Sequence, residues 1–230
     1  MTIEAPILNI APRTAMLRLR ARWEMASRHP LYFLRYFVRT LDQHAPDEMT
    51  VRPFPIHRPH LQALTQLWLD VPLIVCAKSR QVLATWLFVA LNLWYARFRH
   101  GRLIMFQSKK EDDAKGNENA GDGLLGRGKF ILNHIPYHKE LCADVHIGAL
   151  ELEFTRMNST IMAIPQGADI IRTHTASSIL SDESGYQPDF SDSYTAAIPT
   201  ITRGGKFTAL SSANPGFFQQ LFEDRIGGGR

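Results

Sequence analysis

Two adjacent carboxylates stand at the end of a short apolar stretch. Residues 175–184 read Thr-Ala-Ser-Ser-Ile-Leu-Ser-Asp-Glu-Ser, which places Asp182 and Glu183 directly after a small, apolar strand. Open α/β sheets bind ligands outside the carboxyl ends of their strands. Nucleotide hydrolysis needs one carboxylate for Mg²⁺ and a second that orients or deprotonates the attacking water. Asp182 and Glu183 are candidates for these two roles, although an acidic helix start after a strand would read the same way.

A basic loop between an apolar strand and a long helix is the second candidate. Residues 71–86 read Val-Pro-Leu-Ile-Val-Cys-Ala-Lys-Ser-Arg-Gln-Val-Leu-Ala-Thr-Trp. In a phosphate-binding loop of this layout, amides at the helix N-terminus and a lysine contact the phosphates. The usual Gly-x-x-x-x-Gly-Lys-Ser/Thr pattern is violated, because Lys78 and Leu83 replace its glycines and Ala84 replaces its lysine. Only Thr85 survives, as the magnesium-side hydroxyl, and an exposed turn with two basic residues is the alternative.

Small polar residues end a third apolar strand. Ser211, Ser212 and Asn214 follow the apolar run that begins at Phe207. If this strand neighbours the carboxylate strand, these side chains would lie beside a nucleotide. Hydroxyl and amide groups there can sense the γ-phosphate and report it to the following helix. An ordinary turn built from Asn-Pro-Gly is the alternative interpretation.

Alternating elements must position these three groups. Apolar runs at 72–77, 103–107, 160–164, 176–181 and 207–211 predict strands that are buried on both faces, as in a parallel sheet. Helical stretches at 84–99, 109–120 and 216–224 lie between or after them. This alternation implies βαβ crossovers and a three-layer α/β sandwich with a mostly parallel central sheet.

The flanking segments divide the chain. Residues 14–50 and 60–70 are predicted to be helical, and the prolines between Val51 and Pro59 mark a boundary between them. We therefore expect an N-terminal helical extension at 1–52, a main domain at 53–226 and a flexible tail at 227–230. The glycine-rich segment Gly116 to Gly128 is predicted to be a mobile loop.

Composition excludes several classes of protein. The chain has 230 residues, and its 45% hydrophobic content excludes disorder as the dominant state. Cys76 and Cys142 cannot build a disulfide scaffold, and the chain has no Cys-x-x-Cys zinc pattern, so a reducing compartment is expected. The most apolar stretch, Trp86 to Tyr95, is about half a membrane span and predicts a core helix rather than an anchor. We also expect no signal peptide.

The net charge of +4 is unevenly distributed. Basic residues are in excess before residue 130 and acidic residues after it, which suggests a polyanion surface beside a carboxylate-bearing site or, alternatively, surface solubility alone. Candidates for contact with DNA phosphates are Lys109, Lys110, Arg127, Lys129 and Arg203, each of which also fits a solvated surface. The pairs His57 with His60 and His134 with His138 could ligate a metal, but no carboxylate or cysteine completes either set.

The order of the three candidates is that of an ASCE-type P-loop NTPase with an added strand. This order resembles the large terminase subunit of tailed bacteriophages, specifically its N-terminal packaging ATPase domain. Some members of that family carry the loop lysine at its beginning, and Lys78 to Thr85 looks like that variant. Arg58 to Gln62 is similar to the family's adenine-contacting segment, and Leu210 to Gly216 to its coupling motif. The matching stretches, which extend from about residue 28 to about residue 224, also include Pro30-Leu-Tyr-Phe, Ser159 to Pro165, Ile171-Arg172 and the Walker B strand.

The resemblance implies ATP and Mg²⁺ as cofactors and a role for each site residue. Lys78 and the loop amides would bind the β- and γ-phosphates, Thr85 and Asp182 would hold Mg²⁺, and Glu183 would activate water. Arg80 would touch the γ-phosphate or signal the nucleotide state, with an arginine from a neighbouring subunit as the alternative. Gln62 would contact adenine, while Ser212 and Asn214 would relay the nucleotide state. The nucleotide-binding set is Gln62, Lys78, Ser79, Arg80, Gln81, Val82, Leu83, Ala84, Thr85, Ser212 and Asn214.

The resemblance also implies partners. A terminase motor translocates double-stranded DNA into a procapsid as a ring, expected to be pentameric, on a portal protein, and a small terminase subunit selects the DNA. It would act in the host cell cytoplasm, at the procapsid, without a membrane. The chain stops about one helix after the coupling motif, so ATP hydrolysis is expected and the family's nuclease activity is not. The alternatives are a helicase-like or regulatory nucleotide-binding module that binds nucleic acid without packaging it, and a binding-only domain with a degenerate phosphate loop.

Overall fold

A computed structural model describes residues 12–42, 45, 50–79 and 82–227. The helices are α1 (Pro12–Arg28), α2 (Pro30–Phe37), α3 (Pro59–Asp70), α4 (Ala84–Phe98), α5 (Glu111–Lys115), α6 (Leu124–Asn133), α7 (His138–Leu141), α8 (Asp169–Thr173), α9 (Phe190–Thr202) and α10 (Phe217–Gly227), with short 3₁₀ turns η2 (Thr155–Met157) and η3 (Ser184–Tyr186). The strands are β1 (Arg39–Leu41), β2 (Val51–Pro53), β3 (Leu73–Ala77), β4 (Leu103–Gln107), β5 (Val145–Ile147), β6 (Glu151–Phe154), β7 (Ser159–Ile164), β8 (Ser178–Ser181) and β9 (Lys206–Ser211).

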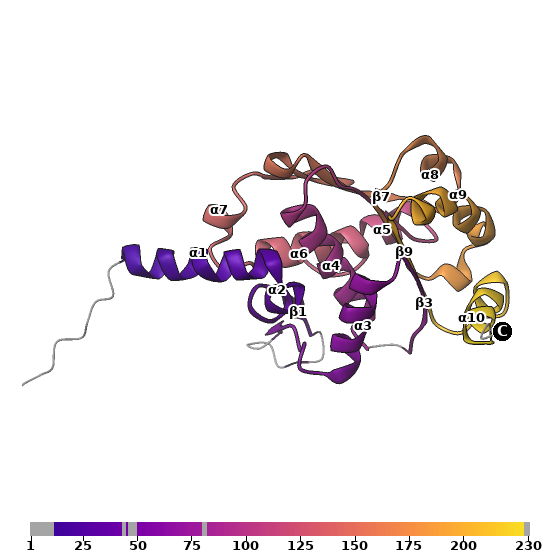
Figure 1. Ribbon diagram of the computed structural model, residues 1–230, viewed down its shortest axis with the longest axis horizontal. Helices are drawn as coiled ribbons and strands as arrows, with labels where there is room; N and C mark the ends of the chain where they lie inside the picture. Colours follow the sequence, from indigo (N-terminus) through magenta and orange to yellow (C-terminus); the bar gives the residue numbers. More distant parts are fainter. Residues whose placement is uncertain (1–11, 43–44, 46–49, 80–81, 228–230) are drawn as a thin grey trace, which may run out of the picture.

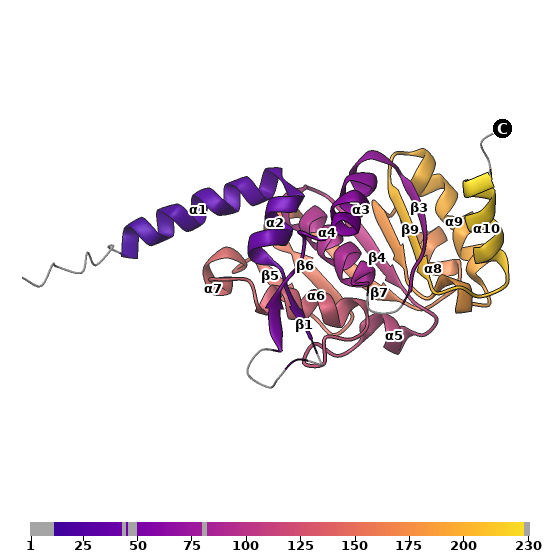
Figure 2. The ribbon, with the colours of Figure 1, turned by 90° about the horizontal axis from the view of Figure 1, so that it is seen from below.

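Within these residues, the central sheet has the strand order β3-β9-β8-β4-β7-β6-β5. Neighbours from β3 to β7 are parallel, whereas β6 and β5 extend the sheet antiparallel to β7 and to each other. Parallel neighbours need crossover connections, and helices on both faces of the sheet supply them (Figure 2). The predicted α/β architecture with a mostly parallel sheet is confirmed. The two short strands β1 and β2 form a separate antiparallel pair.

The sheet is buried on both faces, as its apolar strands predicted. Side chains alternate between the faces of a strand, so consecutive residues enter different hydrophobic cores. On β4, Ile104 and Phe106 belong to the core beneath α4, and Met105 belongs to the core beneath α9. On β8, Leu180 and Ile179 divide in the same way. Helices α2, α3, α4 and α6 cover the first face, and α8, α9 and α10 cover the second, which gives three layers.

Helix α4 is the centre of the first layer. Every residue from Ala84 to Trp94 is buried, because α2, α3 and α6 surround the helix above the sheet. Two of its buried polar residues have partners inside the protein: Asn92 donates from Nδ2 to the carbonyl of Phe88, and Arg97 pairs with Asp144 at 3.0 Å. The predicted core helix is therefore confirmed. Of the helices in the described part of the chain, none is long and apolar enough to cross a membrane.

The glycine-rich segment 116–128 was predicted to be a mobile loop, and this prediction is wrong. Helix α6 begins at Leu124 inside the segment, and Gly126 and Gly128 are buried within it. The absence of a side chain at these glycines lets two backbone segments lie in contact. A Cβ added to Gly116 would lie 2.5 Å from the Cα of Gly123, and one added to Gly126 would lie 2.8 Å from the backbone nitrogen of Asn117. The loop is therefore folded tightly against α6.

Two predicted helices are shorter than expected. The helix expected at 109–120 ends at Lys115, because Gly116 adopts a φ of 64° that a helix cannot continue. The helical run expected at 14–50 ends at Phe37, and the chain then forms β1, which pairs with β2 across the segment 42–50. The expected strands at 72–77, 103–107, 160–164, 176–181 and 207–211 correspond to β3, β4, β7, β8 and β9.

The N-terminal helices pack on the main body. Figure 1 shows α1 extending away from the sheet, with α2 lying beside α4. Phe33, Leu34 and Phe37 of α2 share the hydrophobic core of α4, and Trp94 donates from its indole nitrogen to the carbonyl of Ala26 at 2.8 Å. The boundary expected at residue 52 stays a prediction. Residues 228–230 of the expected tail lie outside the described residues.

Candidate active site

The three sequence candidates meet at one edge of the sheet. Strand β9 lies between β3 and β8, so the carboxyl ends of all three parallel strands are adjacent and the segments that follow them converge. The polar residues after β9 are expected at the site only if β9 neighbours the carboxylate strand. Strand β9 does neighbour that strand, which is β8. A cavity of about 660 Å³ opens at this edge. It is lined by Lys78, Ser79, Ser108, Lys109, Asp112, Asp113, Gly116, Asn117, Asp122, Gly123, Arg127, Asp182, Glu183, Tyr186 and Ser212.

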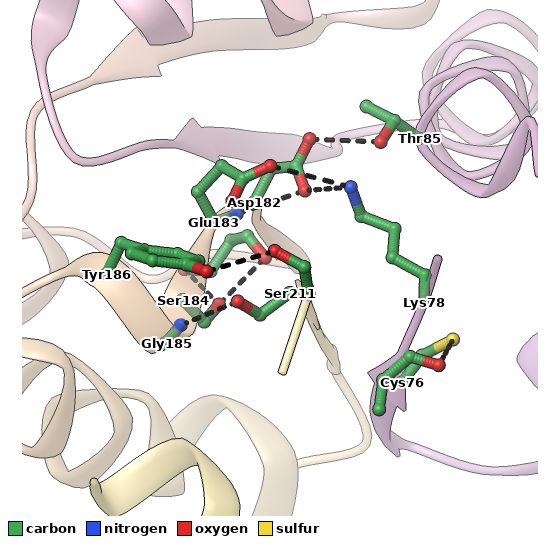
Figure 3. A network of polar contacts seen from close by, with 12 residues as sticks. Cys76, Lys78, Thr85, Asp182, Glu183, Ser184, Gly185, Tyr186 and Ser211 are labelled. Carbon is green, nitrogen blue, oxygen red and sulfur yellow. Dashed lines mark hydrogen bonds and ion pairs between the residues drawn. The ribbon is translucent and has the colours of Figure 1, made fainter. Parts of the chain in front are cut away.

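Asp182 connects the basic loop with the carboxylate strand. The Nζ of Lys78 lies 3.2 Å from Oδ1 of Asp182, and the hydroxyl of Thr85 donates to Oδ2 of the same carboxylate at 3.0 Å (Figure 3). The side chains of Lys78 and Asp182 are only 14% and 11% exposed, so solvent weakens this ion pair little. One carboxylate thus holds the first residue of the loop and the first turn of α4.

The backbone around Asp182 fixes its position. Its amide donates to the carbonyl of Gln107 on β4, and its carbonyl accepts from Nε2 of Gln187 at 2.8 Å. The amide of Glu183 donates to Oδ1 of Asp182 at 3.0 Å. The Glu183 carboxylate itself is 41% exposed and lies 3.7 Å from the Lys78 ammonium. Asp182 is therefore held by several bonds, whereas the half-exposed Glu183 lines the cavity and its carboxylate contacts Lys78.

Two site residues hold an unusual backbone conformation. Leu83, at the start of α4, has φ 61°, and Glu183 has φ 54°. The left-handed region is disfavoured for residues with a Cβ and persists only where the surrounding structure imposes it. Leu83 stands where a standard phosphate loop has its second glycine. A left-handed residue thus precedes α4 at this position although the glycine is absent.

A hydrogen-bond network joins the carboxylate turn to the end of β9. The amide of Gly185 donates to the hydroxyl of Ser211 at 3.0 Å, and Nδ2 of Asn214 donates to the carbonyl of Gly185 at 2.5 Å. The hydroxyl of Ser212 donates to that of Tyr186 at 3.4 Å. The residues expected to relay the nucleotide state therefore contact the turn that carries Glu183.

The structure places the other expected site residues as follows. Five of the expected residues line the cavity: Lys78, Ser79, Asp182, Glu183 and Ser212. Thr85 reaches the cavity through its bond to Asp182. Helix α4 begins at Ala84, directly after Val82 and Leu83. Gln62 is exposed on the first turn of α3 and is not among the cavity's lining residues. The nearby His60 ring lies 3.3 Å from the carbonyl of Val82. Arg80 and Gln81 lie outside the described residues.

Several lining residues were not assigned to the site from the sequence. Arg127 and Lys109 were considered only for DNA contact, yet both line the cavity. Burial lowers the pKa of the Arg127 guanidinium, and the nearby carboxylates of Asp182, Asp122 and Glu183 oppose that shift. Asp112, Asp113 and Tyr186 were not considered at all. Their only sequence signal is that they follow strands of the site at a short distance, which does not specify where the side chains lie.

The donor set at Asp182 fits Mg²⁺. The Thr85 hydroxyl and the Asp182 carboxylate are oxygen donors within 3.0 Å of each other, and Mg²⁺ prefers such oxygen ligands, usually with phosphate oxygens and water. In the part of the chain that the structure describes, no three His, Cys, Asp or Glu side chains form a group that could hold a metal ion by themselves. Phosphate and water would therefore have to complete the coordination.

No protein-family model and no curated protein sequence matches this chain. Solved structures of bacteriophage large terminases do match. The large terminase of bacteriophage HK97 is 16% identical with a TM-score of 0.62 and covers 88% of this chain and 41% of its own. A mutant ATPase domain of the Thermus phage P74-26 large terminase is 16% identical with a TM-score of 0.54, over 70% of this chain and 68% of its own.

A third match is the ADP complex of a large terminase from a thermophilic bacteriophage. It is 13% identical with a TM-score of 0.52, over 74% of this chain and 43% of its own. This chain thus spans about two fifths of the length of the HK97 protein and of the ADP-bound protein. At these identities the likeness establishes the fold. The sequence resemblance is confirmed at that level, and the chain has the α/β fold of the ATPase domains of bacteriophage large terminases.

Proposed function

We propose that this chain is the ATPase motor domain of a phage terminase large subunit, which hydrolyses ATP to translocate double-stranded DNA. The observation that carries the proposal is the set of contacts at Asp182. One buried carboxylate contacts the first residue of the phosphate loop and the first turn of the following helix, and a second carboxylate stands beside it. Nucleotide-hydrolysing sites need this combination of a phosphate-binding cation, a metal-holding carboxylate and a base.

Thr85 and Asp182 are the residues that would hold Mg²⁺, and the ion would neutralise phosphate charge. The cavity otherwise carries more carboxylates than cations, because Asp112, Asp113 and Asp122 add to Asp182 and Glu183. A triphosphate would be repelled from such a cavity without a metal ion. Nucleotide affinity should therefore depend on magnesium.

Lys78 would exchange partners when a nucleotide binds. Its ammonium lies between the carboxylates of Asp182 and Glu183, at 3.2 and 3.7 Å. Phosphate oxygens entering the cavity would compete for the same ammonium. Release of Lys78 would free Glu183, whose carboxylate would then orient the attacking water and accept its proton.

The hydrogen-bond network at the end of β9 would transmit the nucleotide state of the site to α10. Glu183 and Gly185 belong to one turn, and that turn is bonded to Ser211 and Asn214. A shift of Glu183 on hydrolysis would alter these bonds and the position of α10, which follows Asn214. We assign Ser212 and Asn214 the role of relaying the nucleotide state toward a DNA-contacting surface. The portal protein, the small terminase subunit, a pentameric ring and a location at the procapsid in the host cytoplasm complete the proposal.

Steady-state ATP hydrolysis with and without linear duplex DNA tests the proposal. We expect magnesium-dependent turnover that duplex DNA stimulates and that Glu183→Gln lowers by about 100-fold or more, the range for loss of a general base. Lys139→Gln, on the surface segment α7, is the matched control and should leave turnover unchanged. Unchanged turnover in Glu183→Gln would contradict the assigned mechanism. Turnover that duplex DNA leaves unaltered would favour the regulatory nucleotide-binding module instead.

A further inference from the structure

A second cation enters the candidate site from α6. Arg127 lies on the first turn of this helix and lines the same cavity as Lys78, Asp182 and Glu183. The phosphate loop has Ala84 where the usual lysine stands, and its remaining lysine, Lys78, comes at the beginning of the loop. The site therefore lacks a cation at the helix start, where Arg127 approaches.

The Arg127 side chain is held in place by two contacts. Its guanidinium carbon lies 5.6 Å from the centre of the Trp86 ring, and its Nη1 donates to the carbonyl of Gly123 at 2.6 Å. Trp86 directly follows Thr85, and an edge-to-face contact with Phe130 at 5.5 Å fixes its ring. The guanidinium is thus positioned beside the helix start without a ligand. A group positioned in advance loses little conformational entropy when it binds.

Among the described residues, the Arg127 guanidinium has a single hydrogen-bond acceptor, the carbonyl of Gly123. A guanidinium carries five N–H donors, and Arg127 uses one of them on Gly123. Its Nε is buried without a hydrogen-bond partner, and among the described carboxylates none lies within ion-pair distance of it. A buried, unpaired charged donor is costly, which favours a site that is completed by an anion. The cavity in front of Arg127 is where a phosphate would enter.

We propose that Arg127 binds the terminal phosphate of the nucleotide held by its own subunit, and that it supplies the cation that the phosphate loop lacks at Ala84. The inference rests on the proposed function of the same site. A planar guanidinium can form two parallel hydrogen bonds to a phosphate, so an arginine suits this task better than a single ammonium. As charge develops on the terminal phosphoryl oxygens during hydrolysis, the same contact would stabilise the transition state.

Nucleotide binding separates this role from a structural one. The variants are Arg127→Gln and Arg127→Lys, and Lys139→Gln on the exposed surface of α7, outside the cavity, is the control. Affinities for magnesium with ADP and with a non-hydrolysable ATP analogue are measured by calorimetry, together with kcat and the melting temperature. We expect Arg127→Gln to weaken binding of the analogue about 10-fold more than binding of ADP and to lower kcat about 100-fold, the loss typical for one preorganised charged donor. Arg127→Lys should recover part of both.

Three results would overturn the inference. The first is wild-type affinity and turnover in Arg127→Gln. The second is an equal loss of ADP and analogue binding that accompanies a lower melting temperature, which a structural role through Trp86 would produce. The third is recovery of hydrolysis on mixing Arg127→Gln with Glu183→Gln subunits, because an arginine that acts from a neighbouring subunit would restore activity in the mixture. Failure of the wild type to bind either nucleotide would overturn the proposed function and this inference with it.

Discussion

The ammonium of Lys78 lies 3.2 Å from Oδ1 of Asp182, and both side chains are almost completely removed from solvent. The pair joins the residue that follows β3 to the residue that follows β8, across the intervening strand β9. The pair therefore stabilises the edge of the sheet at which the two strands end. Each partner neutralises a charge that would otherwise be buried alone.

Removal of Lys78 alone should destabilise the fold. Lys78→Ala leaves Asp182 without its ammonium partner, and we expect the free energy of unfolding to fall by about 2 kcal/mol, somewhat less than for a fully buried pair. Lys78→Ala with Asp182→Asn removes both charges and should recover part of that loss. Urea denaturation of the two single variants and the double variant gives the coupling energy. A double variant whose loss equals the sum of the single losses would show that the ion pair contributes nothing.

Leu83 provides a test of backbone strain. The φ of Leu83 is 61°, a conformation that is unfavourable for any residue with a Cβ but that glycine adopts freely. Both Leu83→Ala and Leu83→Gly lose the partly buried leucine side chain, but only the glycine variant also loses the strain. We expect Leu83→Gly to be more stable than Leu83→Ala by about 1 kcal/mol, as measured by urea denaturation. An alanine variant as stable as the glycine variant would mean that the loop relaxes to a negative φ in solution.

The sheet was predictable from the sequence because its strands carry strong local signals. Buried parallel strands are continuous apolar runs, and β4 was located at residues 103–107 from that pattern alone. Strands β5 and β6 at the antiparallel edge were missed because they are only three and four residues long, so their alternation of polar and apolar residues is too short to stand out. Helix α6 was missed because its glycines were interpreted as mobility, although they permit close packing against Asn117.

The candidate site was predictable only in part. The segments that follow β3, β8 and β9 were recognised, since strand ends are visible in the sequence and parallel strands end at one edge, whereas Ser108 and Lys109 after β4 were not. Arg127 and the carboxylates of α5 reach the cavity through the tertiary fold of 108–127, for which the sequence has no periodic signal. The spatial order, with β9 between β3 and β8, likewise depends on long-range pairing.

Gly185 tests whether the carboxylate turn is coupled to β9. A Cβ at this position would lie 2.8 Å from the Ser211 hydroxyl, so Gly185→Ala should break the bond from the Gly185 amide to Ser211 and displace Asn214. We expect ATP turnover to fall about 10-fold or more, as misplacement of catalytic groups by a fraction of an ångström does. Turnover and the melting temperature are measured together.

The control for Gly185→Ala is Gly148→Ala, where the added Cβ lies 3.2 Å from the flexible side chain of Glu151 and 3.4 Å from its carbonyl oxygen. This variant should keep wild-type turnover. A second variant, Gly185→Ala with Ser211→Ala, removes the hydroxyl that the new Cβ meets. If the double variant regained full turnover, the space at Gly185 would matter and its hydrogen bond to Ser211 would not.

Cys142 makes the stability of the protein depend on pH at the alkaline end. Burial is the main reason that the pKa of its thiol is raised to about 11, and the Asp144 carboxylate adds to the rise while Arg97 opposes it. Because the folded state keeps the thiol neutral at a pH where the unfolded chain ionises it, the contribution to stability is complete below the unfolded pKa of about 8.5 and is lost as the pH rises toward 11. The free energy of unfolding should therefore fall by about 2 kcal/mol between pH 8.5 and 11 through this group.

Urea denaturation of Cys142→Ala at a series of pH values tests this. The variant starts from a lower stability because a buried sulfur has been removed, but its free energy of unfolding should fall by about 2 kcal/mol less over the same pH range. An identical slope in the two proteins would place the alkaline loss of stability on other groups, such as Cys76, whose pKa is also raised by burial.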